Sequence, residues 1–93
     1  MRWRAYNGDR IPRPGLRTTV RYLNKQRLGP PIQLHGCVWP SGLGWEAYYE
    51  RREAGQLVDV MLGRFDDLRG AQRAVADALL DPANRPSDAA YRY

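Results

Sequence analysis

Three consecutive segments in the middle of the chain alternate apolar and polar residues with a period of two, which is typical of β-strands. They span about Ile32 to Trp39, Trp45 to Arg52 and Leu57 to Gly63. Turn-forming sequence separates them: Pro40 to Gly44 contains proline and two glycines, and Glu53 to Gln56 has the length of a tight hairpin connection. The pattern therefore predicts three sequential antiparallel strands.

The period becomes helical after Phe65. Asp67 is placed to cap the first turn, and Pro82 ends the pattern. Between them the apolar positions fall on one stripe of a helix, namely Leu68, Ala71, Ala74, Val75, Ala78 and Leu79. Such a stripe is buried most simply against a sheet, so the predicted fold class is α+β: a three-stranded antiparallel sheet with one helix, residues 68–80, packed on one face.

The two flanks are interrupted by glycine and proline or are polar. Residues 1–31 read as an irregular basic N-terminal arm, with room for one short strand at Arg17 to Leu23, where β-branched and aromatic residues alternate. Residues 81–93 read as a polar tail. The expected organisation is an arm at 1–31, a sheet-plus-helix domain at 32–80 and a tail at 81–93.

The composition fits a small globular protein. The 93 residues, with 43% hydrophobic and 27% charged residues, allow one domain with a thin core, and deep catalytic clefts are not expected. The sequence has no run of about 20 apolar residues that would predict a membrane span, and residues 1–9 lack the apolar core of a secretory signal. A single cysteine excludes an internal disulfide, so we expect a cytoplasmic protein without a membrane partner.

The charges are unevenly distributed. Residues 1–28 carry a net charge of +7 and the remainder carries −2. Such asymmetry predicts contact with nucleic-acid phosphates. Fourteen of the fifteen basic residues are arginine, which suits bidentate phosphate contacts, although arginine-rich codon usage in a GC-rich genome explains the ratio equally well. The predicted nucleic-acid-binding residues are Arg2, Arg4, Arg10, Arg13, Arg17, Arg21, Lys25 and Arg27.

Few residues could carry catalysis. His35 is the only histidine and Cys37 the only thiol, so no nucleophile and base pair can be named, and a zinc site lacks a second histidine or cysteine. Glu46 and Glu50 are roughly 13 Å apart along a strand, too far for the paired carboxylates of glycoside hydrolysis. We therefore expect a non-enzymatic protein with no catalytic residues, metal, cofactor or small-molecule substrate.

Within the segment from His35 to Leu79, a hairpin tryptophan, a Leu-Gly-x-Phe end of the third strand and an alanine-rich helix follow one another. The residues that carry this pattern are Gly36, Trp45, Ala47, Leu62, Gly63, Phe65, Ala71, Arg73, Ala74 and Ala78. On these residues the segment resembles the Apetala/ethylene-response-factor DNA-binding domain, which also occurs in phage and mobile-element proteins. The resemblance implies a fold of three strands and a helix.

The exposed sheet face departs from that family, which reads the DNA major groove with arginines and tryptophans. The resemblance places at the exposed positions His35, Val38, Pro40, Glu46, Tyr48, Glu50, Asp59 and Met61, none of which is arginine. Carboxylates facing phosphates would repel them, so this acidic and apolar face suits a protein partner better than DNA.

Two functional hypotheses follow. In the first, the protein is associated with nucleic acid, its arginines contact phosphates, and Tyr48 or Trp39 adds base stacking. In the second, the chain is similar in size and layout to small phage-encoded inhibitors, including anti-CRISPR proteins, and binds a host protein or nucleoprotein complex. The partner-binding face in that second hypothesis consists of His35, Glu46, Tyr48, Glu50, Asp59 and Met61.

Overall fold

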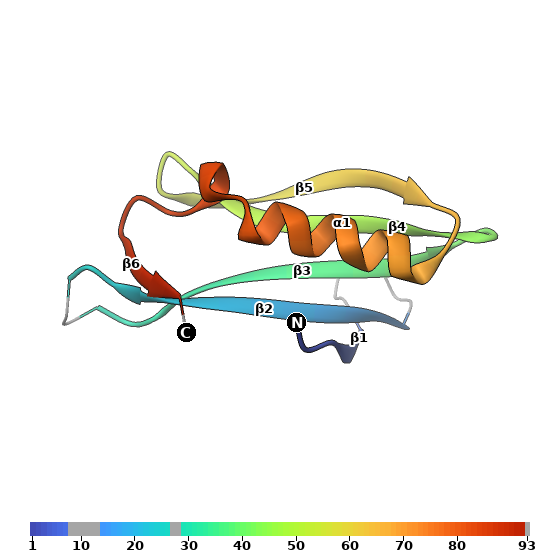
Figure 1. Cartoon of the computed structure of the whole chain (residues 1–93), viewed down its shortest axis with the longest axis horizontal. Coiled ribbons are helices and arrows are strands. Elements are labelled where there is room, and N and C mark those ends of the chain that lie inside the picture. The colour runs from blue at the N-terminus through green and yellow to red at the C-terminus, as the bar shows by residue number, and fades with distance from the viewer. Residues whose placement is uncertain (8–13, 27–28, 93) are drawn as a thin grey trace.

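The computed structural model describes residues 1–7, 14–26 and 29–92, and these contain one antiparallel sheet of six strands and one α-helix (Figure 1). The strands lie in the order β1–β2–β3–β4–β5, and β6 pairs with β2 on the same side as β1. In chain order the elements are β1 (Arg4–Asn7), β2 (Pro14–Asn24), β3 (Ile32–Ser41), β4 (Gly44–Glu53), β5 (Gln56–Phe65), α1 (Leu68–Leu80), the 3₁₀ helix η1 (Pro82–Asn84) and β6 (Ala89–Arg92).

The predicted three-stranded sheet with an irregular N-terminal arm is wrong. β2 is a full strand of the sheet and pairs with β3 from Leu16↔Val38 to Tyr22↔Ile32. Glycine and proline stand before or at the start of β2, whereas its interior is β-branched and aromatic and buries Val20. β3 occupies one edge of β2, and the short strands β1 and β6 pair with the two ends of its other, outer edge.

The hairpins follow the predicted turn chemistry. Ala54 and Gly55 both have positive φ, 50° and 79°, as a two-residue type I′ turn between β4 and β5 requires. Gly42, with φ of 58°, makes the turn between β3 and β4. The predicted connection at 53–56 is therefore confirmed.

The helix has the predicted bounds and cap. Asp67 accepts a hydrogen bond from the Gly70 backbone N–H at 2.6 Å. α1 lies across β3, β4 and β5 on one face of the sheet (Figure 1), and the predicted packing of its apolar stripe on that face is confirmed, since Ala71, Val75 and Leu79 share the core with Ala47. Within the described chain, no helix has the length and apolar character needed to span a bilayer.

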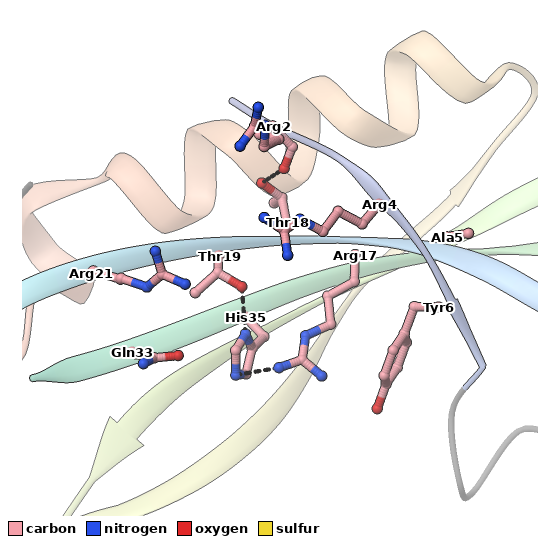
Figure 2. A pocket seen from close by; sticks show the side chains of 10 residues that line it. All are labelled: Arg2, Arg4, Ala5, Tyr6, Arg17, Thr18, Thr19, Arg21, Gln33 and His35. Atoms are coloured by element: carbon pink, nitrogen blue, oxygen red, sulfur yellow. Dashed lines mark hydrogen bonds between the residues drawn. The ribbon is translucent and has the colours of Figure 1, made fainter.

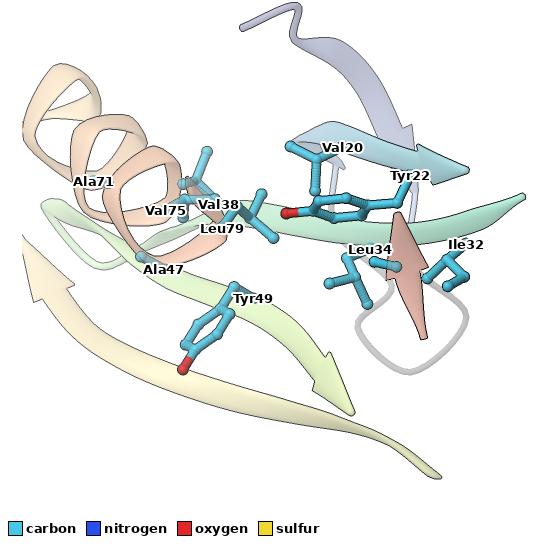
Figure 3. Packing of buried hydrophobic residues seen from close by; sticks show 11 residues of the cluster. Val20, Tyr22, Ile32, Leu34, Val38, Ala47, Tyr49, Ala71, Val75 and Leu79 are labelled. Atoms are coloured by element: carbon cyan, nitrogen blue, oxygen red, sulfur yellow. The ribbon is translucent and has the colours of Figure 1, made fainter. Parts of the chain in front are cut away.

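The core lies between α1 and the central strands (Figure 3). Val38, Ala47, Ala71 and Val75 are fully buried, and Trp45, Val60 and Leu62 are partly buried at its margin. Val58 lies outside this cluster.

Gly36 marks the closest approach of helix and sheet. A Cβ at this position would overlap Val75 Cγ1 and lie 3.0 Å from Leu79 Cδ1. The α1 backbone therefore sits directly on a strand position without a side chain. Because residues alternate along a strand, the neighbours His35 and Cys37 project to the opposite side, which we call the open face.

Candidate functional site

The outer edge of β2 is paired at both ends and open between them. β1 pairs with Pro14 to Arg17, and β6 pairs with Tyr22 and Asn24, so in the described part of the chain residues 18–21 have no strand partner on this side. A hollow of about 350 Å³ lies at this gap (Figure 2). Its described lining consists of Arg2, Arg4, Ala5, Tyr6, Arg17, Thr18, Thr19, Arg21, Gln33 and His35.

Four arginines border this hollow, and none of its described lining residues is acidic. Arg4 and Arg17 are direct cross-strand partners, and Arg21 follows on the same face of β2. The Thr18 hydroxyl donates to the Arg2 carbonyl at 2.6 Å and holds the chain before β1 against β2. Like charges placed directly opposite one another destabilise a sheet, so the pairing of Arg4 with Arg17 costs stability unless an anion lies between them, and the cluster is a candidate anion site.

Arg17 is fixed in place from two sides. Its guanidinium donates to His35 Nε2 at 2.5 Å, and it lies 4.7 Å from the centroid of the Tyr6 ring in a cation–π contact. Tyr6 in turn packs on Trp39 with ring centroids 5.6 Å apart. Figure 2 shows Arg17 held between the His35 and Tyr6 side chains. A guanidinium already ordered in this way loses less entropy when it binds a ligand.

The contacts of His35 define its protonation state. Because Nε2 accepts from Arg17, the ring proton is on Nδ1 and is donated to Thr19 Oγ1 at 2.7 Å. Burial, together with the charges of Arg17 and Arg21, lowers the pKa of His35 to about 4. His35 is therefore neutral at pH 7 and serves to position Arg17. The hydroxyl proton of Thr19 is left to donate to another acceptor.

We expect the free energy of unfolding to fall as the pH is lowered from about 6.5 to about 4. In this window the unfolded chain binds a proton at His35 and the folded protein does not. His35→Gln should remove this part of the pH dependence, because the glutamine carbonyl still accepts from Arg17 but does not titrate. Thermal unfolding of both proteins at pH 7 and at about pH 4.5 measures the effect; equal losses in both would contradict the assignment to His35.

The predicted basic residues separate into three groups. Arg2, Arg4, Arg17 and Arg21 are brought together at the hollow. Lys25 lies beyond them near the end of β2, where it lines a second hollow with residues of the C-terminal segment. The remaining three, Arg10, Arg13 and Arg27, lie outside the described residues.

The six residues predicted as a partner-binding face all lie on the open face. Cross-strand pairs share a face, and these include Tyr48↔Met61 and Glu50↔Asp59. Asp59 and Met61 are exposed, while the others are half-buried, namely His35, Glu46, Tyr48 and Glu50. β4 and β5 therefore give one half of the open face its carboxylates and Met61, together with Arg52 and with Arg64, the cross-strand partner of Glu46. β1 and β2 give the other half an arginine cluster without carboxylates.

Two positions that the family resemblance placed on the exposed face are on the helix side instead. Val38 is fully buried in the core and pairs with Ala47, and Pro40 pairs with Trp45. The assignment was wrong because His35 and Val38 are three residues apart on one strand and so face opposite sides. Trp39 does belong to the open face, but Tyr6 covers it and only 4% of it is exposed, which removes it as a base-stacking residue.

Glu50 completes the hydrogen bonding of the sheet. The pairing of β3 with β4 stops at Gly36↔Tyr49, and the next β3 amide, that of His35, donates to Glu50 Oε1 at 2.8 Å. Burial raises the pKa of Glu50, although this backbone N–H opposes the shift. One member of the acidic half is therefore committed to the fold.

The thiol and imidazole on the open face are not arranged for nucleophilic catalysis. Burial raises the pKa of Cys37 to about 11, so the thiol is protonated at neutral pH. Both ring nitrogens of His35 are engaged by Arg17 and Thr19. Among the residues that the structure describes, no group of three or more His, Cys, Asp or Glu side chains could hold a metal ion. The arginines at the hollow have the donor groups and the charge that suit an anion.

The sequence pointed to the arginines but not to Tyr6 and Thr19, and it assigned His35 to the partner-binding face instead of to Arg17. The alternation of Arg17, Thr19 and Arg21 with apolar or small residues is the signal that could have placed them on one face. Comparison with known protein families, curated proteins and solved structures gives no match to this chain.

Proposed function

We propose that the protein is a non-enzymatic binding protein that contacts nucleic-acid phosphates through Arg2, Arg4, Arg17 and Arg21. The observation that carries this proposal is the convergence of these four side chains on one hollow whose described lining contains no carboxylate. Each guanidinium presents a fork of N–H donors that matches phosphate oxygens.

The distribution of charge supports the same assignment. Arg17 is held ready by His35 and Tyr6, which favours binding without further ordering. On the opposite half of the open face Glu46, Glu50 and Asp59 lie among Arg52 and Arg64, so positive charge is not concentrated there. A nucleic acid is thereby directed to the edge formed by β1 and β2.

A salt titration of duplex DNA binding tests this proposal. If the cluster neutralises phosphates, the logarithm of the association constant should fall with the logarithm of salt concentration with a slope of about −0.9 for each phosphate contacted, up to about −3.6 if each arginine contacts its own phosphate. Fluorescence anisotropy of a labelled duplex between about 50 and 300 mM salt measures it. A slope near zero would mean that the cluster does not contact phosphates.

The gathering of all six predicted residues on the open face favours a second candidate, an inhibitor that binds a host protein or nucleoprotein complex. Asp59 and Met61 are its most exposed members. A pull-down from a bacterial lysate, run with and without nuclease, should then retain protein partners after nuclease treatment, and Asp59→Lys should reduce their capture through new charge repulsion. Loss of all captured material on nuclease treatment would leave only the nucleic-acid function.

A further inference from the structure

We infer that the hollow at the edge of β2 takes a phosphomonoester, the terminal phosphate of a nucleic-acid strand, in preference to internal phosphodiesters. The inference rests on the proposed function, because it names the group on the nucleic acid that the arginine cluster binds.

The shape of the cluster is the first argument. Proteins that follow a nucleic-acid backbone spread their basic residues along a ridge or groove, since successive phosphates are spaced along the strand. Here Arg2, Arg4, Arg17 and Arg21 instead surround one hollow of about 350 Å³. That volume is at the lower end of the range of small-ligand sites and suits one terminal nucleotide. The positive charge is concentrated at a point, so a group of high charge density fits it best.

The charge of the ligand is the second argument. A phosphomonoester carries about −1.5 to −2 at pH 7 and has three strong acceptor oxygens, whereas an internal diester carries only a single negative charge. The hollow offers donors in excess: four guanidinium groups, and the Thr19 hydroxyl, whose oxygen already accepts from His35 Nδ1. His35 is neutral and its Nε2 is occupied by Arg17, so the positive charge of the hollow comes from the arginines.

The backbone at the site is the third argument. Residues 18–21 of β2 have no described strand partner on their outer edge, and alternate residues of such an edge direct their N–H groups outward. The end of a nucleic-acid strand can enter this gap between β1 and β6, whereas a continuous nucleic-acid backbone would have to pass across the gap. The outward N–H groups of residues 18–21 are thus more accessible to the terminal phosphate of a nucleic acid than to an internal one.

The test compares two single-stranded oligonucleotides of one sequence, one with a 5′-phosphate and one with a 5′-hydroxyl. At about 0.15 M salt and pH 7.5 we expect the phosphorylated probe to bind about tenfold more tightly. Lowering the pH to about 5.5 should reduce this preference, because the second pKa of a phosphomonoester is about 6. His35, whose pKa is about 4, stays neutral over this range.

Matched variants locate the effect. Arg17→Gln combined with Arg21→Gln should abolish the preference for the phosphorylated probe. Arg69→Gln combined with Arg73→Gln removes the same charge from exposed positions on α1 and should retain it. Equal affinity for the two probes would overturn the inference while leaving the proposed function standing, and no binding of either probe would overturn both. A preference that survives the Arg17 and Arg21 substitutions would also overturn it.

Discussion

Replacing Gly36 with valine is expected to lower the melting temperature by at least about 15 °C. Even the Cβ of a side chain at this position overlaps Val75 Cγ1, and both neighbours, Val75 and Leu79, are fully buried under α1. A Cβ cannot rotate away, so the helix must lift from the sheet or the strand must shift. Overpacking of this kind costs about 3 kcal/mol or more where the backbone itself has to move, against a total stability of about 5 to 15 kcal/mol.

Thermal unfolding followed by circular dichroism measures this loss. Gln33→Val is the matched control, since it adds a β-branched residue to the same strand on the exposed open face and should leave the melting temperature nearly unchanged. Gly36→Ala should be destabilising in the wild-type protein. The stability that it costs should be smaller when Val75 has already been replaced by alanine, because the shortened residue vacates the space that the new methyl needs. Additive losses in the double variant would contradict the contact.

Replacing Arg2, Arg4, Arg17 and Arg21 together with glutamine is expected to reduce the affinity for duplex DNA at 0.1 M salt by about tenfold for each phosphate that the cluster contacts, and by up to about 10³-fold. Each phosphate neutralised contributes about 0.9 to the salt slope, and therefore about 0.9 powers of ten in affinity between 1 M and 0.1 M salt, up to about 3.6 if each arginine contacts its own phosphate. The slope itself should become shallower by the same amount. Because the four side chains border one hollow, removing them should weaken one and the same contact with DNA.

The folded state should survive this quadruple substitution, because all four arginines are exposed or half-buried and their mutual repulsion is removed. Only Arg17 makes contacts within the fold that its replacement would remove, with His35 and Tyr6. Glutamine keeps a hydrogen-bond donor at that position, which limits the loss of stability. The circular dichroism spectrum and melting temperature check the fold. A variant that remains folded and binds DNA with an unchanged salt slope would contradict the proposed function.

The middle of the chain was predictable because local pattern and tertiary structure agree there. Strand alternation in β3 to β5, the type I′ turn at Ala54 and Gly55, and the Asp67 cap of α1 are each determined by residues close in sequence. The alternation at Arg17 to Leu23 predicted the middle of β2, but the glycines and prolines before it hid β1 and the full length of β2. That this strand joins the sheet depends on the pairing of Val20 and Tyr22 with β3.

The site shows the same division. Sequence alone determined that the positive charge lies in the first third of the chain, since net charge needs no fold to be counted. Only the tertiary structure decided which arginines act together, because pairing Arg4 with Arg17 across an antiparallel ladder depends on the register of β1 on β2. The same register brings Tyr6 over Trp39 and beneath Arg17, and the pairing of β2 with β3 brings His35 to Arg17 and Thr19. Local patterns specify elements, whereas contacts between residues distant in sequence are decided by how edges pair and faces pack.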